Sequence, residues 1–100
     1  MPEVVRAKKD VHVGHTARKN PFHQTSYAAG QSTVFVNGEP VIRKGDKTLC
    51  GDPAVGASGS VFAAGAPIHR KGDATGGHGS GRSNFGGNSA KTGSGDVFAG

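Results

Sequence analysis

The chain contains the segment Val34-Phe35-Val36-Asn37-Gly38-Glu39-Pro40-Val41-Ile42-Arg43-Lys44-Gly45-Asp46, and 27 positions later the same pattern returns as Val61-Phe62-Ala63-Ala64-Gly65-Ala66-Pro67-Ile68-His69-Arg70-Lys71-Gly72-Asp73. The C-terminus stops on the opening half of this pattern, Val97-Phe98-Ala99-Gly100, and the N-terminus begins with a rough copy of the closing half, Val4-Val5-Arg6-Ala7-Lys8-Lys9-Asp10. A period of roughly 20 to 50 residues indicates a repeat architecture. If the two ends meet in space, the chain holds three copies of one unit, and the third is assembled from both termini.

Each copy is predicted to form a short β-hairpin. The pairs Asn37-Gly38 and Ala64-Gly65 follow a Val-Phe start and precede X-Pro, which is typical of a tight turn with positive φ between two strands. The expected strands are 33–37 with 41–44 and 60–64 with 68–71. No window shows the apolar spacing of a helix, so the fold class is predicted to be all-β. Three hairpins around a pseudo-threefold axis would each contribute inward side chains, and we expect the phenylalanines of the repeat to pack in this core: Phe35, Phe62 and Phe98.

The composition limits the size of that core. The 100 residues allow a single domain, 1–100, whose units are expected at about 30–57, at 58–80 and, for the third, at 93–100 plus 2–15. Only 33% of the residues are hydrophobic and 18 are glycine, so little apolar area is available to offset the chain entropy. Cys50 is the only cysteine, which excludes an internal disulfide. Stabilisation by a metal or by a partner is therefore expected.

The charge pattern does not favour nucleic acid. The net charge is +5, but the basic residues are spread as pairs such as Arg43-Lys44 and Arg70-Lys71, with little aromatic interleaving. No specific nucleic-acid binding is expected, although a basic nucleic-acid-binding module remains an alternative. No apolar stretch approaches the roughly 20 residues needed to span a bilayer, and the N-terminus lacks an apolar segment of signal-peptide length. The chain is thus expected to be made in the cytosol, without an ordinary export signal.

A candidate metal site follows from the register of the repeats. Asp10 is followed by His15, Asp46 by Cys50 and Asp73 by His78, each four or five residues later. Threefold symmetry would bring these three side chains together near the axis, and His23, from a segment that only one unit carries, is the natural fourth ligand. Three nitrogens and one sulfur suit tetrahedral Zn²⁺ near the apex, while imidazole also suits iron. The predicted ligands are His15, His23, Cys50 and His78.

The remaining histidines and the repeat aspartates are given structural roles. His12 and His69 are expected to be ordinary hydrogen-bonded or solvated side chains, and His69 lies on a return strand, outside the ligand position. His12 remains an alternative to His15 or His23 as a ligand. The aspartates are expected to accept backbone N–H bonds and fix the turn before each ligand loop.

The pattern X-Val-Phe-X-X-Gly-X-Pro-X-X-Arg-X-Gly-Asp resembles the PAAR-repeat proteins, whose Pro-Ala-Ala-Arg motif reads here Pro40-Val41-Ile42-Arg43 and Pro67-Ile68-His69-Arg70. The sequence departs from the family at both Ala-Ala positions and at Ala7-Lys8-Lys9-Asp10, where Arg-X-Gly-Asp is expected. The resemblance implies a small β-rich cone with a pseudo-threefold core and one zinc ion near its vertex, held by three His and one Cys. That ligand set agrees with the set obtained from the register.

The resemblance also implies a function. PAAR-repeat proteins sit on the blunt end of a trimeric β-helical spike, VgrG-like or from a phage tail, one tip per trimer, and sharpen it for membrane piercing. The chain is therefore expected to be a non-enzymatic tip with transient contact to a target membrane. It would be located in a virion, at the central spike of the tail baseplate, or in the cytoplasm before delivery by type VI secretion. A small zinc-dependent hydrolase is a further alternative, in which water replaces His23 at the metal.

Overall fold

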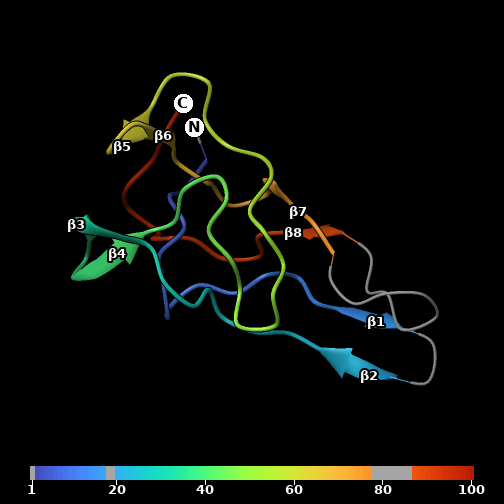
Figure 1. Ribbon diagram of the computed structural model, residues 1–100. Helices are drawn as coiled ribbons and strands as arrows, with labels where there is room; N and C mark the ends of the chain where they lie inside the picture. The colour runs from blue at the N-terminus through green and yellow to red at the C-terminus, as the bar shows by residue number, and fades with distance from the viewer. Residues whose placement is uncertain (1, 18–19, 78–86) are drawn as a thin grey trace.

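The protein is built from short antiparallel hairpins. The computed structural model describes residues 2–17, 20–77 and 87–100, and within them it shows strands and turns without a helix. The body measures 38 × 23 × 21 Å and is therefore elongated. The strands are paired in order along the chain (Figure 1): β1 (His15–Ala17) with β2 (Asn20–His23), β3 (Gln31–Val36) with β4 (Glu39–Val41), β5 (Phe62–Ala63) with β6 (Ala66–Pro67), and β7 (Ala74–Thr75) with β8 (Asn88–Ser89). The predicted all-β fold class is confirmed.

The two full copies of the repeat form the hairpins β3–β4 and β5–β6. Their turns have positive φ at both central residues, 54° and 84° at Asn37-Gly38 and 49° and 87° at Ala64-Gly65, as the sequence predicted. The return strands are shorter and begin earlier than expected. The reason lies in the next segment, where the backbone leaves its own hairpin and pairs with a neighbouring unit, as in the bridge between Arg43 and Ile68.

Three main-chain hydrogen bonds close a ring around the pseudo-threefold axis. The Val5 N–H donates to the His69 carbonyl at 3.2 Å, the His69 N–H to Ile42 at 2.9 Å, and the Ile42 N–H to Val5 at 3.0 Å. These residues hold the same place in the three copies of the pattern, so each unit donates to one neighbour and accepts from the other. Two more sets of contacts repeat the same cycle. They are the bridges Arg6–Val41, Arg43–Ile68 and Arg70–Val4, and the hydrogen bonds Ala7–Pro40, Lys44–Pro67 and Lys71–Glu3.

The two ends of the chain lie side by side and complete this ring. Val4 donates its N–H to Val97 at 2.9 Å, Ala99 donates to Pro2 at 3.0 Å, and Glu3 bridges Phe98. The labelled termini are neighbours in Figure 1. The Glu3–Phe98 bridge is equivalent to the Phe35–Pro40 and Phe62–Pro67 pairs of the two hairpins. The expectation that the termini meet is confirmed. We call the end of the molecule that carries β3–β4, β5–β6 and the paired termini the hairpin end.

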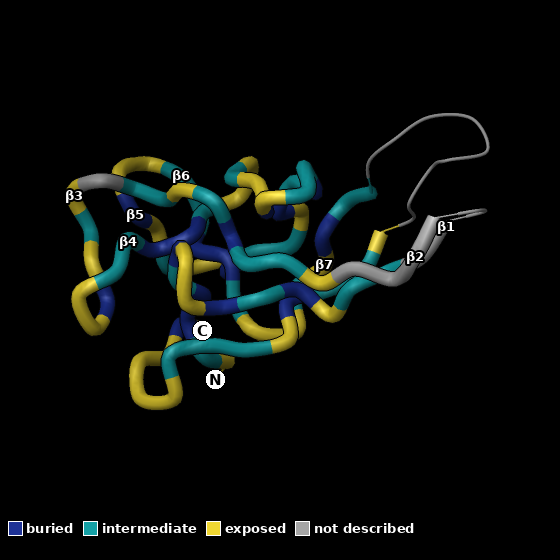
Figure 2. The backbone as a smooth tube through the Cα atoms, turned by 90° about the horizontal axis from the view of Figure 1, so that it is seen from below, coloured by how far each residue is buried: buried dark blue, intermediate teal, exposed yellow. Residues whose placement is uncertain are grey.

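The core inside the hairpins is narrow, and the phenylalanines are not part of it. The buried cluster uses two small or medium residues from each copy: Val36, Ala63 and Ala99 from the outgoing segments, and Val4, Val41 and Ile68 from the returning ones. Figure 2 marks the buried stretches of the backbone in dark blue. Phe35, Phe62 and Phe98 are 57%, 56% and 47% exposed, so the prediction that they pack in the core is wrong. Side chains alternate along a strand, and the face turned to the axis is the one that carries the valines and alanines. Three backbones that approach one axis this closely leave space for those smaller groups.

A second buried layer lies next to the hydrogen-bonded ring. It contains Val5 and Ile42 together with Tyr27, Ala54 and Ala90. His69 takes the third place of the ring, where its neighbours are apolar, and its two nitrogens are both used. Nε2 lies 2.8 Å from the Tyr27 hydroxyl and Nδ1 lies 2.7 Å from the Gly56 carbonyl. Burial lowers the pKa of His69 and raises that of Tyr27, so both groups stay neutral. His69 is thus the hydrogen-bonded side chain that the sequence predicted.

The aspartate that ends each copy fixes a turn, also as predicted. Asp46 and Asp73 each accept the backbone N–H of the arginine three residues earlier at 2.8 Å, and Asp10 accepts that of Arg6 at 2.7 Å. The arginine side chain returns to the same carboxylate in each unit, with Nε–Oδ2 distances of 2.9, 3.8 and 2.8 Å for Arg6, Arg43 and Arg70. These contacts raise the pKa of Arg6 and Arg70. The turn directs the chain away from the hairpin end.

Candidate metal centre

Beyond the ring, the chain makes a second closed cycle and then three unequal loops. The second cycle consists of the bridges His12–Ala90, Tyr27–Thr48 and Ala54–Thr75. Three short antiparallel pairings continue it outward, at Val11–Ser26, at Lys47–Pro53 and, in β7–β8, at Ala74–Ser89. In each pairing a polar residue directly precedes the residue on the returning segment, and these polar residues are Thr25, Asp52 and Asn88. The loops therefore start from equivalent places but differ in length and side chains.

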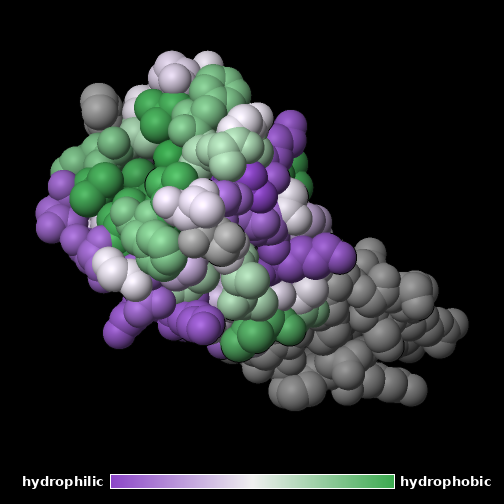
Figure 3. All heavy atoms as spheres, turned by 60° about the vertical axis from the view of Figure 1, so that its left-hand side comes forward, coloured by the Kyte–Doolittle hydropathy of each residue, from purple (hydrophilic) through white to green (hydrophobic). Residues whose placement is uncertain are grey.

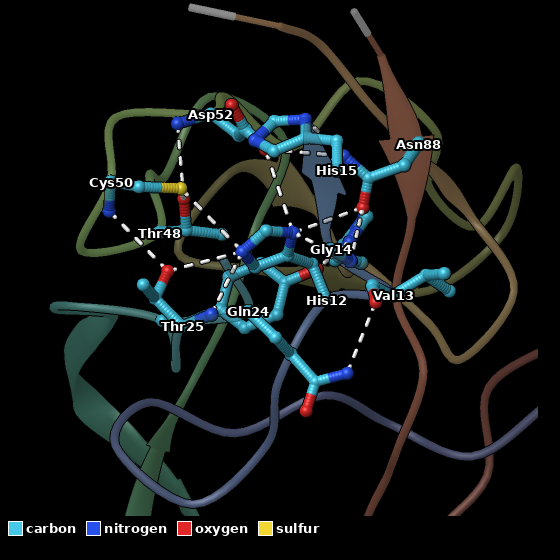
Figure 4. A network of polar contacts seen from close by, with 12 residues as sticks. His12, Val13, Gly14, His15, Gln24, Thr25, Thr48, Cys50, Asp52 and Asn88 are labelled. Atoms are coloured by element: carbon cyan, nitrogen blue, oxygen red, sulfur yellow. Dashed lines mark hydrogen bonds and ion pairs between the residues drawn. The ribbon is translucent and has the colours of Figure 1, made fainter. Parts of the chain in front are cut away.

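Four potential ligands gather where these loops meet. His12, His15, Cys50 and Asp52 each place one ligand atom so that all four atoms lie within 4.8 Å of one another. His12 and Asp52 are buried, while His15 and Cys50 are partly accessible. The side chains come from two of the three loops and point toward one another (Figure 4). We call these four residues the His/Cys/Asp cluster.

His12 lies at the centre of the cluster. Its Nε2 is 3.5 Å from the Cys50 sulfur and 3.1 Å from the Thr25 hydroxyl, and it also accepts the Thr25 backbone N–H at 2.9 Å. On the opposite side of the ring, Nδ1 is 3.0 Å from the Asn88 side-chain oxygen. The imidazole is fully buried, so these contacts fix its orientation.

Asp52 connects both histidines with the third unit. Its Oδ2 lies 3.6 Å from His12 Nδ1 and 3.4 Å from His15 Nε2, and it accepts the Asn88 amide at 3.2 Å. The same Asn88 amide lies 3.1 Å from His15 Nδ1. A buried carboxylate beside two imidazoles provides the kind of oxygen that orients metal-ligating histidines.

Thr48 holds the short loop that carries the thiol. Its hydroxyl is 3.2 Å from the Cys50 sulfur and accepts the Asp52 backbone N–H at 3.0 Å. The Cys50 N–H in turn donates to the Thr25 hydroxyl at 3.3 Å, so the loop is tied to its neighbour. A loop of only three residues between Thr48 and Asp52 thereby keeps the sulfur next to the imidazoles.

The donor set fits a transition metal. Imidazole nitrogen, thiolate sulfur and carboxylate oxygen are the ligands that Zn²⁺ takes in proteins, at about 2.0 to 2.3 Å. In a tetrahedral site these bond lengths place the ligand atoms about 3.3 to 3.8 Å apart, so a spacing within 4.8 Å needs only small side-chain movements. The His/Cys/Asp cluster can hold a metal ion.

The family of the chain is shown by its match to a family model. The model described as PAAR motif matches residues 4–56, which is more than half of the 100 residues. The chain belongs to the PAAR-motif family. No curated protein and no solved structure matched the chain. Among the described residues of this PAAR-motif protein, no helix is long and apolar enough to cross a membrane.

The structure brings together two of the four ligands that were predicted. His15 and Cys50 are both in the His/Cys/Asp cluster. His23 pairs with His15 through the backbone of β1 and β2, but its side chain lies outside the described part of the structure. His78 lies outside the described residues. The full set of His15, His23, Cys50 and His78 therefore stays a prediction.

The sequence interpretation of this PAAR-motif protein underrated His12 and did not consider Asp52. His12 does form hydrogen bonds, as expected, but it also lies in the cluster. Asp52 stands two positions before the buried Ala54, and the other two units have Thr25 and Asn88 at the equivalent position. Each unit therefore has a polar residue two positions before a buried one. This signal in the sequence could be recognised only by extending the repeat alignment beyond the Gly-Asp pair.

Proposed function

We propose that this PAAR-motif protein is a non-enzymatic tip that caps the blunt end of a trimeric β-helical spike in a contractile injection machine. The family motif fits a spike-tip role in such systems. The observation that carries the proposal is the closed ring of Val5, Ile42 and His69, because it gives one chain three nearly equivalent sides. A single chain with this pseudo-symmetry can contact all three subunits of a true trimer in the same way.

In this proposal one zinc ion stabilises the end opposite the hairpin end. The proposed ligands remain His15, His23, Cys50 and His78, with His12 as the alternative to His15 or His23, and Asp52 orients the imidazoles. A four-coordinate site of this kind leaves no position for a substrate, so the metal contributes folding energy rather than catalysis. The ion would connect loops that have little apolar area of their own, and iron is the alternative metal.

Capping would serve the spike as well as the tip. The open strand edges at the end of a β-helix invite pairing with other chains, and a bound tip covers them. A rigid, metal-stabilised point in front of the spike would then lead it through a target membrane, with only transient contact. The protein would be found in a virion baseplate, or in the cytoplasm before delivery by type VI secretion.

Co-purification with a trimeric β-helical spike fragment tests this function. Native mass spectrometry should find one chain of this protein per spike trimer, and elemental analysis should find one zinc per chain. The metal should remain bound through purification, since a closed site exchanges slowly with solvent. Absence of binding to spike trimers from both phage tails and type VI systems would contradict the proposal.

A further inference from the structure

Three phenylalanines occupy one equivalent position of the repeat, and all of them are about half exposed. Each lies opposite the same position of a return segment, in the pairs Phe35–Pro40, Phe62–Pro67 and Phe98–Glu3. The next residue along the chain is buried in every copy, so strand alternation turns each phenylalanine outward. The exposure thus has the same geometric origin three times. It is a property of the repeat.

Their exposure is costly for a chain with so little apolar material. Only 33% of the residues are hydrophobic, yet these three large side chains remain in contact with water. Figure 3, in which the hairpin end is turned forward, shows apolar side chains gathered over this part of the surface with hydrophilic ones around them. Apolar patches with a polar rim mark sites of interaction, and aromatic residues are enriched in the centre of protein interfaces.

Lysine and arginine are sparse at the same end. None of the 12 Lys and Arg residues lies within segments 31–42, 59–69 or 92–100, although the net charge is +5. The charged side chains of these segments are Glu39 and Asp96, and Asp96 accepts a hydrogen bond from the Asn37 amide at 2.9 Å. The N-terminal segment adds Glu3, whose carboxylate lies 3.6 Å from the Lys71 ammonium. The scarcity of cations disfavours a polyanion or an anionic lipid surface at this end.

The threefold arrangement of the phenylalanines indicates a partner with threefold symmetry. We propose that Phe35, Phe62 and Phe98 are the anchors through which the hairpin end docks onto the apolar, threefold-symmetric end of a trimeric β-helical spike, with one phenylalanine for each subunit. This inference rests on the proposed function and assigns its contact residues. In protein interfaces a few well-packed side chains supply most of the binding energy, and aromatic residues are common among them.

Binding of single variants to a purified trimeric spike fragment tests the proposal. Phe35→Ser, Phe62→Ser and Phe98→Ser should each weaken binding by about tenfold or more, and the three factors should agree within about threefold because the positions are equivalent. Val55→Ser is the matched control, since Val55 is 48% exposed but lies outside the repeat pattern of the phenylalanines. It should bind within about twofold of the wild type. Thermal unfolding of all four variants should resemble that of the wild type, because the replaced side chains are half exposed.

The possible outcomes separate this inference from the function on which it rests. If the wild type binds the trimer and the phenylalanine variants bind equally well, the assigned face is wrong while the spike-tip function stands. If the wild type binds no spike trimer, the function fails and the docking face with it. Sedimentation of the free protein and flotation with neutral phosphatidylcholine vesicles complete the test. Self-association or vesicle binding that the three variants abolish would assign the face to a second copy or to lipid and overturn the proposal.

Discussion

The hairpin end and the opposite end of this protein are built from the same repeat but follow opposite rules. At the hairpin end, the three copies place similar residues at most positions, and their hydrogen bonds form the closed ring of Val5, Ile42 and His69. At the opposite end, which carries the His/Cys/Asp cluster and which we call the cluster end, the three loops start from an equally regular cycle of bridges but then differ in length and chemistry. The difference teaches that repetition supplies the symmetric frame, whereas the chemistry lies where the repeat is broken.

The largest effect that we predict concerns the proposed metal at the cluster end. Removal of the metal by a chelator, or the substitution Cys50→Ala, should lower the melting temperature by more than about 20 °C, because binding free energy of a structural metal is folding free energy. Differential scanning calorimetry with and without chelator measures this. Val55→Ala provides the control, since it truncates a half-exposed side chain outside the His/Cys/Asp cluster.

An unchanged melting temperature of the metal-free chain would contradict this prediction. It would mean that the hydrogen-bonded ring alone stabilises the fold and that the cluster end contributes no metal-dependent stability. Variants of His12, His15 and Asp52 test which side chains bind the metal. Loss of metal from His12→Ala and His15→Ala, with only weakened binding in Asp52→Asn, would separate ligands from an orienting carboxylate.

The second prediction compares the turns that join the two ends. Asp10 is buried and accepts four hydrogen bonds, from the Arg6 backbone, from two Arg6 side-chain nitrogens and from Thr92. Asp46 is more accessible, and its arginine contact is longer, at 3.8 Å. Asp10→Ala should therefore cost about 3 kcal/mol and Asp46→Ala about 1 kcal/mol. Urea denaturation measures both losses of unfolding free energy, and equal losses would contradict the difference between these two turns.

The third prediction uses the polar member of the ring. Burial lowers the pKa of His69 below its usual 6.5, and the hydrogen bond to the Gly56 carbonyl and the nearby Asp73 carboxylate only partly oppose this. His69 therefore binds a proton more readily in the unfolded chain than in the folded one. The stability that neutral His69 provides is fully present above pH 6.5, and it is lost as the pH falls through the lower pKa of His69 in the folded state. The melting temperature should fall between pH 7 and pH 5.

The double variant His69→Ile with Tyr27→Phe isolates this effect, because it removes the histidine together with the hydroxyl that Nε2 contacts. It restores the apolar residue that the other copies have at this place, and its melting temperature should depend less on pH over the same range. The measurement is the difference between the curves of the double variant and the wild type, because that difference isolates the contribution of His69. Parallel curves would contradict the assignment.

The smallest predicted effect concerns a departure from the repeat. Lys8 has φ of 67° where the other copies have Gly45 and Gly72, and all three donate an equivalent backbone hydrogen bond into the second layer. A side chain is disfavoured in this left-handed conformation, so Lys8→Gly should stabilise the protein by about 0.5 kcal/mol. Gly72→Ala, where a Cβ would meet no neighbouring atom within 4 Å, should destabilise it by about 1 kcal/mol. Effects of the same sign in both variants would argue against equivalent turns.

Much of the fold was accessible from the sequence, and less of the metal site. The turns at Asn37-Gly38 and Ala64-Gly65, the Asp-capped turns and the meeting of the termini all follow from local chemistry or from register. The orientation of the phenylalanines does not. A period of two says that Val36 and Phe35 point to opposite sides, but the available space at the axis decides which side is the core.

The same distinction holds for the ligands. His15 and Cys50 were predicted because each follows a repeat aspartate at a similar distance, and both are in the cluster. His12 and Asp52 could not be weighed in the same way, because their neighbours come from other units. His12 meets Cys50, 38 positions along the chain, and Asp52 meets Asn88, 36 positions away. Such contacts depend on how the three loops converge.

The sequence by itself determined the repeat, the strand class, the turns and the types of donor atom available for a metal, since these depend on residue identity and on spacing along the chain. Only the tertiary structure decided which residues fill the axis and which donors face one another. The physical reason is that a closed threefold ring leaves little volume at its centre and fixes where each loop leaves it. The small residues therefore turn inward, Phe35, Phe62 and Phe98 remain outside, and the loops converge on His12, His15, Cys50 and Asp52.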